Sequence, residues 1–194
     1  MAFPRLVQAA EAPEALAHRS DDELMELARA GLREAFSVLV ERHAARVVNL
    51  CSRFVNDAQL GRELAQDSWV LVWQSRDKYR GDGGFVAWLV TVARNHCRNE
   101  LRRRKTAAAH EAHLVDAPQT PRQLDNLLVE ERRRRVRRAL AQLASPLREA
   151  LLLRYGEELR YDEIASVLGT HESTLRSRVH HGLRALKRKL EREP

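Results

Sequence analysis

The sequence is poor in residues that interrupt helices. Only six prolines and eight glycines occur among 194 residues, and aromatic residues make up 5% of the chain. No alternation of apolar and polar residues bounded by hairpin turns is present, which argues against β-strands. The helix formers Ala, Leu, Arg and Glu dominate instead, and an apolar content of 44% is enough to build hydrophobic cores. The sequence therefore predicts an all-α fold.

Cysteine and long apolar runs are also scarce. Cys51 and Cys97 are the only cysteines, and both fall within predicted helices. Two thiols in a chain of this size favour buried small hydrophobes over a disulfide framework. No run is apolar and long enough for a signal peptide or a membrane span, so we expect a cytoplasmic protein without membrane insertion.

Patterns typical of catalysis are missing. The sequence contains no paired carboxylates, no nucleophile with its base, no phosphate-binding loop and no cluster of metal ligands. The stretch His110-Glu111-Ala112-His113 is one residue short of the zinc-protease spacing, and we dismiss it as a metal site. We expect no enzymatic activity, no cofactor and no metal.

The net charge of +7 is distributed unevenly. Acidic residues outnumber basic ones in residues 1–75 and 106–131, whereas basic residues outnumber acidic ones in residues 76–105 and 132–194. Two basic blocks separated by an acidic one indicate two separate contacts with nucleic acid.

Helical periodicity divides the chain into two bundles. Residues 1–19 have no lasting period and are predicted to be a loosely ordered extension. Residues 20–105 form the first bundle, 106–126 a flexible linker and 127–194 the second bundle. A capping box at Ser20 predicts one helix start, and Ser145, as the cap before a proline, predicts another. In the first bundle the expected helices cover residues 20–30, 33–55, 58–75 and 85–105.

The second bundle contains a candidate helix-turn-helix. A short helix from Tyr161 to Leu168 ends at Gly169, and a second helix begins two residues later. The second helix has a basic face and no acidic residue between Glu172 and Glu191, which favours contact with phosphates. A plain helical hairpin with a solvated basic face is the alternative. The predicted inward stripe of the second helix is Leu175, Val179, Leu183, Leu186 and Leu190.

Two features of the first bundle indicate binding surfaces. Trp69 and Trp73 lie beside polar residues, which is typical of a protein–protein surface or of a helix deep within a bundle. In the last helix, Arg94, Arg98 and Arg102 recur every four residues with amides beside them. Together with the preceding loop, this pattern fits a single strand with stacked or flipped bases, while Trp88 is expected in the core.

Taken together, residues 20–190 resemble the extracytoplasmic-function (group IV) sigma factors of bacterial RNA polymerase. The resemblance rests on short segments in both bundles that occur in the order and spacing of that family. These segments are Glu63–Asp67, Tyr79–Asp82, Phe85–Leu89, Ala93–Asn95, Leu151–Tyr155, Tyr161–Gly169 and Thr174–Arg178.

The resemblance implies a function in transcription initiation, with sigma region 2 over residues 20–105 and sigma region 4 over residues 127–194. Region 2 would dock on core RNA polymerase through Glu63, Gln66, Asp67, Trp69 and Trp73. It would recognise and melt the minus-ten element of promoter DNA through Tyr79, Arg80, Phe85, Arg94, Asn95, Arg98 and Asn99. Region 4 would bind the minus-thirty-five element through Thr174, Arg176, Ser177, Arg178, His180, His181 and Arg184. An anti-sigma partner is a further expectation.

The chain departs from the family pattern at a few positions. His181 stands where Arg is usual, Gly182 where Ala is usual, and Arg160 where Ser or Thr would cap a helix. These differences bear on promoter preference. A stand-alone helix-turn-helix transcriptional regulator remains the alternative function. Such a regulator would need a dimer seam to read paired half-sites, and no heptad seam is visible.

Overall fold

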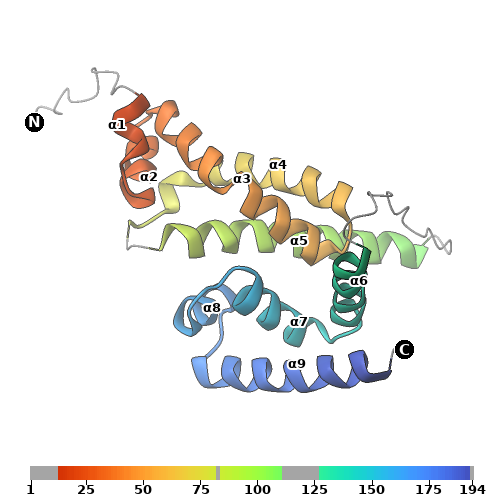
Figure 1. Cartoon of the computed structure of the whole chain (residues 1–194). Coiled ribbons are helices and arrows are strands. Elements are labelled where there is room, and N and C mark those ends of the chain that lie inside the picture. Colours follow the sequence, from red (N-terminus) through yellow and green to blue (C-terminus); the bar gives the residue numbers. More distant parts are fainter. Residues whose placement is uncertain (1–12, 82–83, 111–126, 193–194) are drawn as a thin grey trace, which may run out of the picture.

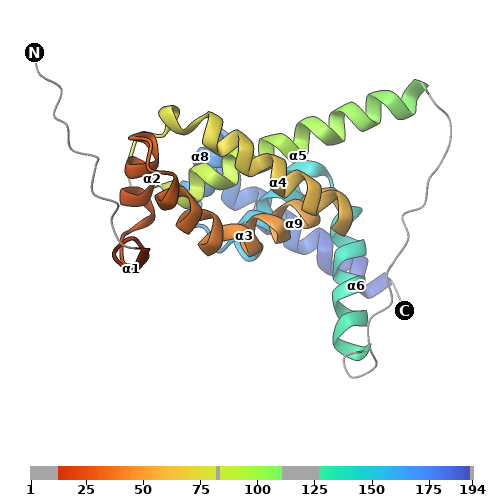
Figure 2. The same cartoon turned by 90° about the horizontal axis from the view of Figure 1, so that it is seen from above.

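The computed structural model describes residues 13–81, 84–110 and 127–192, and these residues form helices and connecting turns without strands (Figures 1 and 2). The all-α prediction is confirmed. An N-terminal bundle comprises α1 (Pro13–Ala17), α2 (Asp21–Arg29), α3 (Arg33–Val55), α4 (Ala58–Gln74), the 3-10 turn η1 (Arg76–Lys78) and α5 (Phe85–His110). A C-terminal bundle comprises α6 (Leu127–Ala141), α7 (Ser145–Leu151), the π-helical turn η3 (Leu152–Gly156), α8 (Tyr161–Leu168) and α9 (Glu172–Arg192).

Local capping explains where the first helices begin. The Ser20 hydroxyl accepts a hydrogen bond from the Glu23 backbone at 3.3 Å, and the Glu23 carboxylate accepts one from the Ser20 backbone at 2.8 Å. This reciprocal pair confirms the predicted capping box. At the start of α4 the Asp57 carboxylate accepts hydrogen bonds from the backbone of Gln59 and Leu60.

The structure differs from the sequence-based boundaries at both ends of the N-terminal bundle. Within the extension predicted to be loosely ordered, residues 13–17 are helical, and Leu16 packs in the core at 1% exposure. At the other end, α5 continues to His110, into the segment predicted as linker. Three alanines follow Thr106, and alanine has the highest helix propensity, so nothing stops the helix there. The rest of the predicted linker, residues 111–126, lies outside the described residues.

The start of α7 corrects a second expectation. Ala144 is the cap residue, whereas Ser145 is already the first residue of the helix. The Ser145 hydroxyl instead donates a hydrogen bond to Glu149 Oε1 at 2.8 Å. The Ser145 side chain therefore binds the buried Glu149 carboxylate and does not cap α7.

Close packing between α7 and α9 accounts for the unusual glycine in α9. A Cβ atom at Gly182 would lie 3.1 Å from Leu151 Cγ and 3.4 Å from the Leu147 carbonyl oxygen. Leu175 and Val179 are buried on the same side, but Leu183 is 41% exposed, so its predicted place in the inward stripe is wrong. Gly182 takes that place, where a Cβ atom would make tight contacts with Leu151 and Leu147 of α7.

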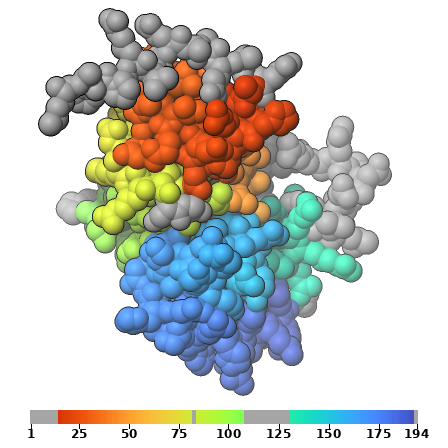
Figure 3. Space-filling model, turned by 90° about the vertical axis from the view of Figure 1, so that its left-hand side faces the viewer, coloured from red at the N-terminus to blue at the C-terminus, as the bar shows by residue number. Residues whose placement is uncertain are grey.

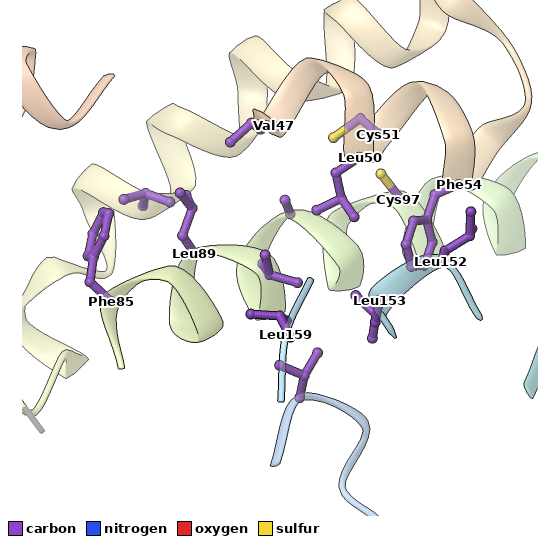
Figure 4. Packing of buried hydrophobic residues seen from close by; sticks show 14 of the residues in the cluster. Val47, Leu50, Cys51, Phe54, Phe85, Leu89, Cys97, Leu152, Leu153 and Leu159 are labelled. Atoms are coloured by element: carbon purple, nitrogen blue, oxygen red, sulfur yellow. The ribbon is translucent and has the colours of Figure 1, made fainter. Parts of the chain in front are cut away.

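The two bundles pack directly against each other. Helix α5 contacts α8, and α3 contacts η3. Figures 1 and 3 show the C-terminal bundle seated beneath α5. The buried apolar residues of both bundles form one continuous cluster, in which Phe54, Leu152, Leu153 and Leu159 lie near the contact between bundles (Figure 4). The sequence pattern predicted two bundles but did not predict that they share a core.

Candidate polymerase and nucleic-acid interfaces

One candidate surface lies on α4, and we call it the α4 patch: Glu63, Gln66, Asp67, Trp69 and Trp73. Its three polar side chains are exposed, whereas both indoles are half-buried. Val70, between the two tryptophans, is 54% exposed and extends the apolar part of the surface. The α4 patch thus combines exposed polar groups with accessible aromatic and aliphatic area, a composition typical of protein interfaces.

The tryptophans of the α4 patch are fixed in position by their neighbours. The Phe36 ring lies 5.8 Å from Trp69 in an edge-on arrangement and 5.0 Å from Trp73. The Arg76 guanidinium stacks 4.3 Å from the Trp73 ring and donates a hydrogen bond to the Trp73 carbonyl oxygen. Neither Phe36 nor Arg76 was identified as a support from the sequence. Phe36 reaches the tryptophans only through the packing of α3 against α4, whereas Arg76 lies three residues after Trp73.

The aromatic residues that flank the loop after η1 are buried. Tyr79 and Phe85 are 3% and 2% exposed, and their ring centres lie 6.0 Å apart. The Tyr79 hydroxyl donates a hydrogen bond to Asp22, and the half-buried Trp88 ring packs against Tyr79 at 5.3 Å. In this conformation the rings anchor the two ends of the loop, and neither offers a face on which a base could stack. Arg80, between them, is exposed.

The basic face of α5 is divided between solvent and the bundle contact. Asn95, Arg98 and Asn99 are exposed, as the proposed contact with DNA requires. Arg94 is only 6% exposed. Its Nε donates a hydrogen bond to Glu149 Oε2 at 2.7 Å, across the contact between the bundles. Sequence reasoning missed Glu149 as a partner of Arg94, although a carboxylate within the stretch 147–153, which is apolar apart from Arg148 and Glu149, is a signal that could have drawn attention to it.

A second polar contact joins α3 to the turn after η3. Glu157 is 4% exposed, and its carboxylate lies 3.6 Å from Arg53 Nη1 and 3.8 Å from Arg46 Nε. Arg53 also donates a hydrogen bond to the Gly156 carbonyl oxygen at 3.0 Å. Burial raises the pKa of Glu157 from 4.5 to about 7, and the charges of Arg53 and Arg46 offset part of this rise.

The raised pKa of Glu157 makes stability dependent on pH. Between its unfolded pKa of 4.5 and its folded pKa of about 7, the folded protein retains a proton that the unfolded chain has lost. The free energy of unfolding contributed by this group therefore decreases as pH rises through that window, by roughly 3 kcal/mol at most, and then levels off. Urea titrations of wild type and Glu157→Gln between pH 5 and 8 measure this contribution as the difference between the two pH profiles.

The matched control for this prediction is Glu158→Gln, at an exposed neighbouring carboxylate. We expect Glu158→Gln to keep the wild-type pH profile and Glu157→Gln to flatten it. Identical profiles for Glu157→Gln and wild type would contradict the burial of a protonated Glu157.

The helix-turn-helix geometry is well defined. Gly169 has φ 59° and ψ 45°, the left-handed conformation that ends α8, and the Thr170 backbone donates to the Ala165 carbonyl oxygen at 3.0 Å. On α9 the exposed residues include most of those predicted to contact DNA, and Arg178 is half-buried. The exposed ones are Thr174, Arg176, Ser177, His180, His181 and Arg184.

Neighbouring residues hold Arg176 in place near the start of α9. Its Nε donates a hydrogen bond to Glu172 Oε1 at 3.1 Å, and its guanidinium stacks 4.5 Å from the Tyr161 ring of α8. A guanidinium oriented in this way retains donors for a base edge or a phosphate. Tyr161 is a supporting residue that sequence reasoning did not identify.

The start of α8 lacks a side-chain cap, as the departure at Arg160 implied. The Arg160 backbone donates a hydrogen bond to Glu163 Oε2 at 2.7 Å, and the Arg160 guanidinium pairs with Asp162 at 2.8 Å. The first turn is therefore stabilised by acidic side chains on the helix itself.

A helix-turn-helix with an exposed basic second helix, beside another basic helix, is the arrangement of a helical DNA-binding protein. Residues 39–107 match the family model of Sigma-70 region 2, and residues 133–186 match that of Sigma-70, region 4. The chain is 31% identical over 182 residues to the ECF RNA polymerase sigma-E factor of Salmonella typhimurium, covering 89% of this chain and 95% of that protein. It belongs to the extracytoplasmic-function sigma factors.

Other comparisons agree. The RNA polymerase sigma-H factor of Pseudomonas aeruginosa is 29% identical over 186 residues, covering 91% of this chain and 96% of that protein. The structure of CnrH in complex with the cytosolic domain of CnrY has a TM-score of 0.71 at 22% identity, covering 90% of this chain and 99% of that one. The sigma factor RpoE of Bartonella quintana, in complex with the anti-sigma factor NepR, has a TM-score of 0.66 at 20% identity, covering 82% and 98%. These two structures share the fold.

The function of the chain is that of an RNA polymerase sigma factor, which directs core polymerase to promoters and opens the minus-ten element. The family consists of transcription initiation factors without catalytic activity of their own. Within the described residues, no helix is both long and apolar enough to span a membrane.

Proposed function

We propose that the two bundles divide the work of initiation, with region 2 over residues 20–105, region 4 over residues 127–194 and a linker over residues 106–126. Because α5 continues to His110, the start of this linker is helical. The observation that carries the proposal is the placement of an exposed recognition helix on one bundle and an exposed polar-aromatic patch on the other. One surface suits DNA and the other suits a protein.

The α4 patch is the proposed docking site for core RNA polymerase. Glu63, Gln66 and Asp67 are exposed on a helix whose opposite side is buried, so they contribute little to the fold. Trp69 and Trp73 are held by Phe36 and present the remaining part of their rings. Aromatic anchors surrounded by polar groups are typical of the residues that dominate binding energy.

The minus-ten element is the proposed ligand of the loop and of the α5 face. Arg80, Asn95, Arg98 and Asn99 are exposed and supply donors for phosphates and unstacked bases. Arg94 joins them once its contact with Glu149 is released. Tyr79 and Phe85 support the loop in the described conformation, and base stacking on either ring requires that ring to turn outward on DNA.

The minus-thirty-five element is the proposed ligand of α9. Arg176 and Ser177 lie near its N-terminal end, the part of a recognition helix that reads base edges. Thr174, His180 and His181 are exposed next to them and complete the proposed reading surface. Arg178 and Arg184 suit contacts with the phosphate backbone.

An anti-sigma protein is a further proposed partner. The two solved structures compared above each contain a second chain, the cytosolic domain of CnrY in one and the anti-sigma factor NepR in the other. This chain likewise exposes the α4 patch and two basic helices, which an inhibitor could cover. Because polymerase acts in the cytoplasm, we place the protein there, acting without catalysis of its own and without membrane insertion.

Run-off transcription tests the proposed function directly. Core polymerase with this protein, supplied with fragments of its genome, is expected to produce discrete transcripts that core polymerase alone does not produce. Transcripts identical with and without the protein would contradict the proposal. A stand-alone regulator, the alternative function, would change the output of another holoenzyme without starting transcription with core polymerase.

We also predict that the free protein binds promoters weakly and with strong dependence on salt. The two elements lie ~25 base pairs apart, or ~85 Å at ~3.4 Å per base pair, whereas each bundle is only roughly 30 Å across. The bundles contact each other in the structure, so one molecule cannot reach both elements without separating them. Electrophoretic mobility shifts should show tight specific binding only with core polymerase present. Nanomolar specific binding of a full promoter by the free monomer at physiological salt would contradict this prediction.

A further inference from the structure

Two carboxylates of α2 lie against the segment that carries Arg80. Helix α2 contacts both η1 and α5 (Figure 1). The hydroxyl of Tyr79, the residue directly after η1, donates a hydrogen bond to the Asp22 carboxylate. A Cβ atom at Gly81 would lie 2.7 Å from Glu26 Oε1, so the backbone at Gly81 packs directly on the Glu26 side chain. The exposed Arg80 lies between these two contacts.

The Tyr79 side of this segment is held by both ends of the tyrosine side chain. The ring is 3% exposed, and its centre lies 6.0 Å from the Phe85 ring and 5.3 Å from the Trp88 ring. A buried hydroxyl without an acceptor is costly, and a hydrogen bond to a carboxylate is stronger than one between neutral groups. Asp22 therefore supplies the acceptor that a buried Tyr79 needs.

The Gly81 side is held by the close approach of backbone and carboxylate. Gly81 has φ +69°, a left-handed conformation that glycine adopts without strain. Arg29 Nη1 donates hydrogen bonds to both oxygens of Glu26, at 2.8 and 3.1 Å, and so gives this carboxylate a defined orientation. The backbone after Arg80 thus rests on a side chain that is itself held in place.

Helix α2 is in turn fixed on α3 and α5. The Asp21 carboxylate accepts a hydrogen bond from Arg42 Nη1 at 2.8 Å and lies 2.7 Å from His43 Nε2. The His43 ring packs 5.6 Å from Phe85, which also contacts Tyr79. These contacts form a closed circuit from α3 through α2 and Tyr79 to α5 and back to α3. Helix α2 is therefore a fixed support for the segment 79–81.

We propose that Asp22 and Glu26 are positioning residues for minus-ten recognition, because they fix the backbone on both sides of Arg80 and thereby set the direction of its side chain. This inference rests on the proposed role of Arg80 in binding the minus-ten strand. Tyr79 acts from its buried position, since turning outward onto a base would break its hydrogen bond to Asp22. A donor that reads a base must be held in a narrow geometry, so a loosened support reduces base preference.

Four substitutions and one control test the two supports. Tyr79→Phe removes only the hydroxyl and keeps the ring. Asp22→Ala removes its acceptor, and Glu26→Ala removes the side chain beneath Gly81. Arg80→Ala identifies the base positions that Arg80 reads. The control is Glu34→Ala, which removes the same charge from an exposed position in the first turn of α3, as Asp22→Ala does in the first turn of α2.

The readout is the base preference of the holoenzyme in a promoter library that is randomised over the minus-ten element and constant elsewhere. Tyr79→Phe, Asp22→Ala and Glu26→Ala should each reduce the preference by about three- to tenfold at the positions affected by Arg80→Ala. Glu34→Ala should keep the wild-type profile. A variant that was merely less stable would instead lower transcription from all library members alike.

A double variant tests whether the support acts through Arg80. If the Tyr79 hydroxyl only positions Arg80, then Tyr79→Phe combined with Arg80→Ala should match Arg80→Ala alone within about twofold, because no guanidinium remains to be oriented. Losses of preference that multiply in the double variant would show an independent role and overturn the inference.

Two further results would overturn it. One is a wild-type profile for both Tyr79→Phe and Asp22→Ala. The other is faster promoter opening by Tyr79→Phe, measured by permanganate reactivity of unpaired thymines, because release of the hydroxyl would then help the ring to turn outward. If one of these variants loses helical circular dichroism, the other decides.

Failure of the inference and failure of the proposed function give different results. Run-off transcription by the wild-type holoenzyme would still support the proposed function if the variants of Tyr79, Asp22 and Glu26 kept the wild-type profile. An unchanged profile for Arg80→Ala would contradict the proposed role of Arg80 itself, and the inference with it.

Discussion

Replacing Gln66 and Asp67 together with alanine is expected to weaken the complex with core RNA polymerase by about 1–3 kcal/mol, or roughly 5- to 150-fold in Kd. Both side chains are exposed on α4, next to the half-buried rings of Trp69 and Trp73. Truncating them removes polar contacts with the polymerase while leaving the packed side of the helix untouched. Run-off transcription at limiting sigma factor should fall in proportion.

We expect this double substitution to leave the fold and its thermal stability unchanged. Asp67 makes one weak contact, with His96 at 3.7 Å, and its side chain is 67% exposed, so the unfolding temperature should stay within about 2 °C of wild type. Ser37→Ala with Glu41→Ala is a matched control, because it removes one polar and one acidic side chain from exposed positions on α3. The affinity is measured by titration against labelled core polymerase. If the Gln66 and Asp67 variant bound as tightly as wild type, α4 would not be the docking surface.

Arg176→Ala is expected to cost about 1–3 kcal/mol in binding to the preferred promoter and to relax the preference at a single base position. The guanidinium is held by Glu172 and by the Tyr161 ring, so it is already oriented before DNA binds. Loss of an oriented donor pair affects the cognate base far more than other bases. Binding of the holoenzyme to a library randomised over the minus-thirty-five element measures the change.

Arg184→Ala is the contrasting variant on the same helix. Arg184 is exposed two turns beyond Arg176, and its proposed role is to contact a phosphate. Its removal should weaken binding to all library members alike and reduce the slope of log K against log salt by about 1. If both variants changed the library profile in the same way, the separation of base reading and phosphate contact on α9 would be wrong.

The sequence alone was sufficient to predict most of the helices and the family. Local patterns are read within one or two turns, so the capping box at Ser20, the left-handed Gly169 and the helix over 33–55 all appear in the structure as predicted. The motif order along the chain likewise identified two sigma regions, which the family comparisons confirm. Both kinds of information lie in residue type and spacing.

Only the tertiary structure decided which members of these patterns are available to a ligand. Arg94 and Arg98 occupy successive turns of one basic stripe, yet Arg94 is buried against Glu149, 55 residues away, and Arg98 is exposed. Gly182, a departure from the family pattern in the sequence, lies close to Leu147 and Leu151 of α7 in the structure. A periodic pattern records which side of a helix is apolar or charged. It does not record which distant segment packs on that side, because that depends on the shapes and charges of both bundles together.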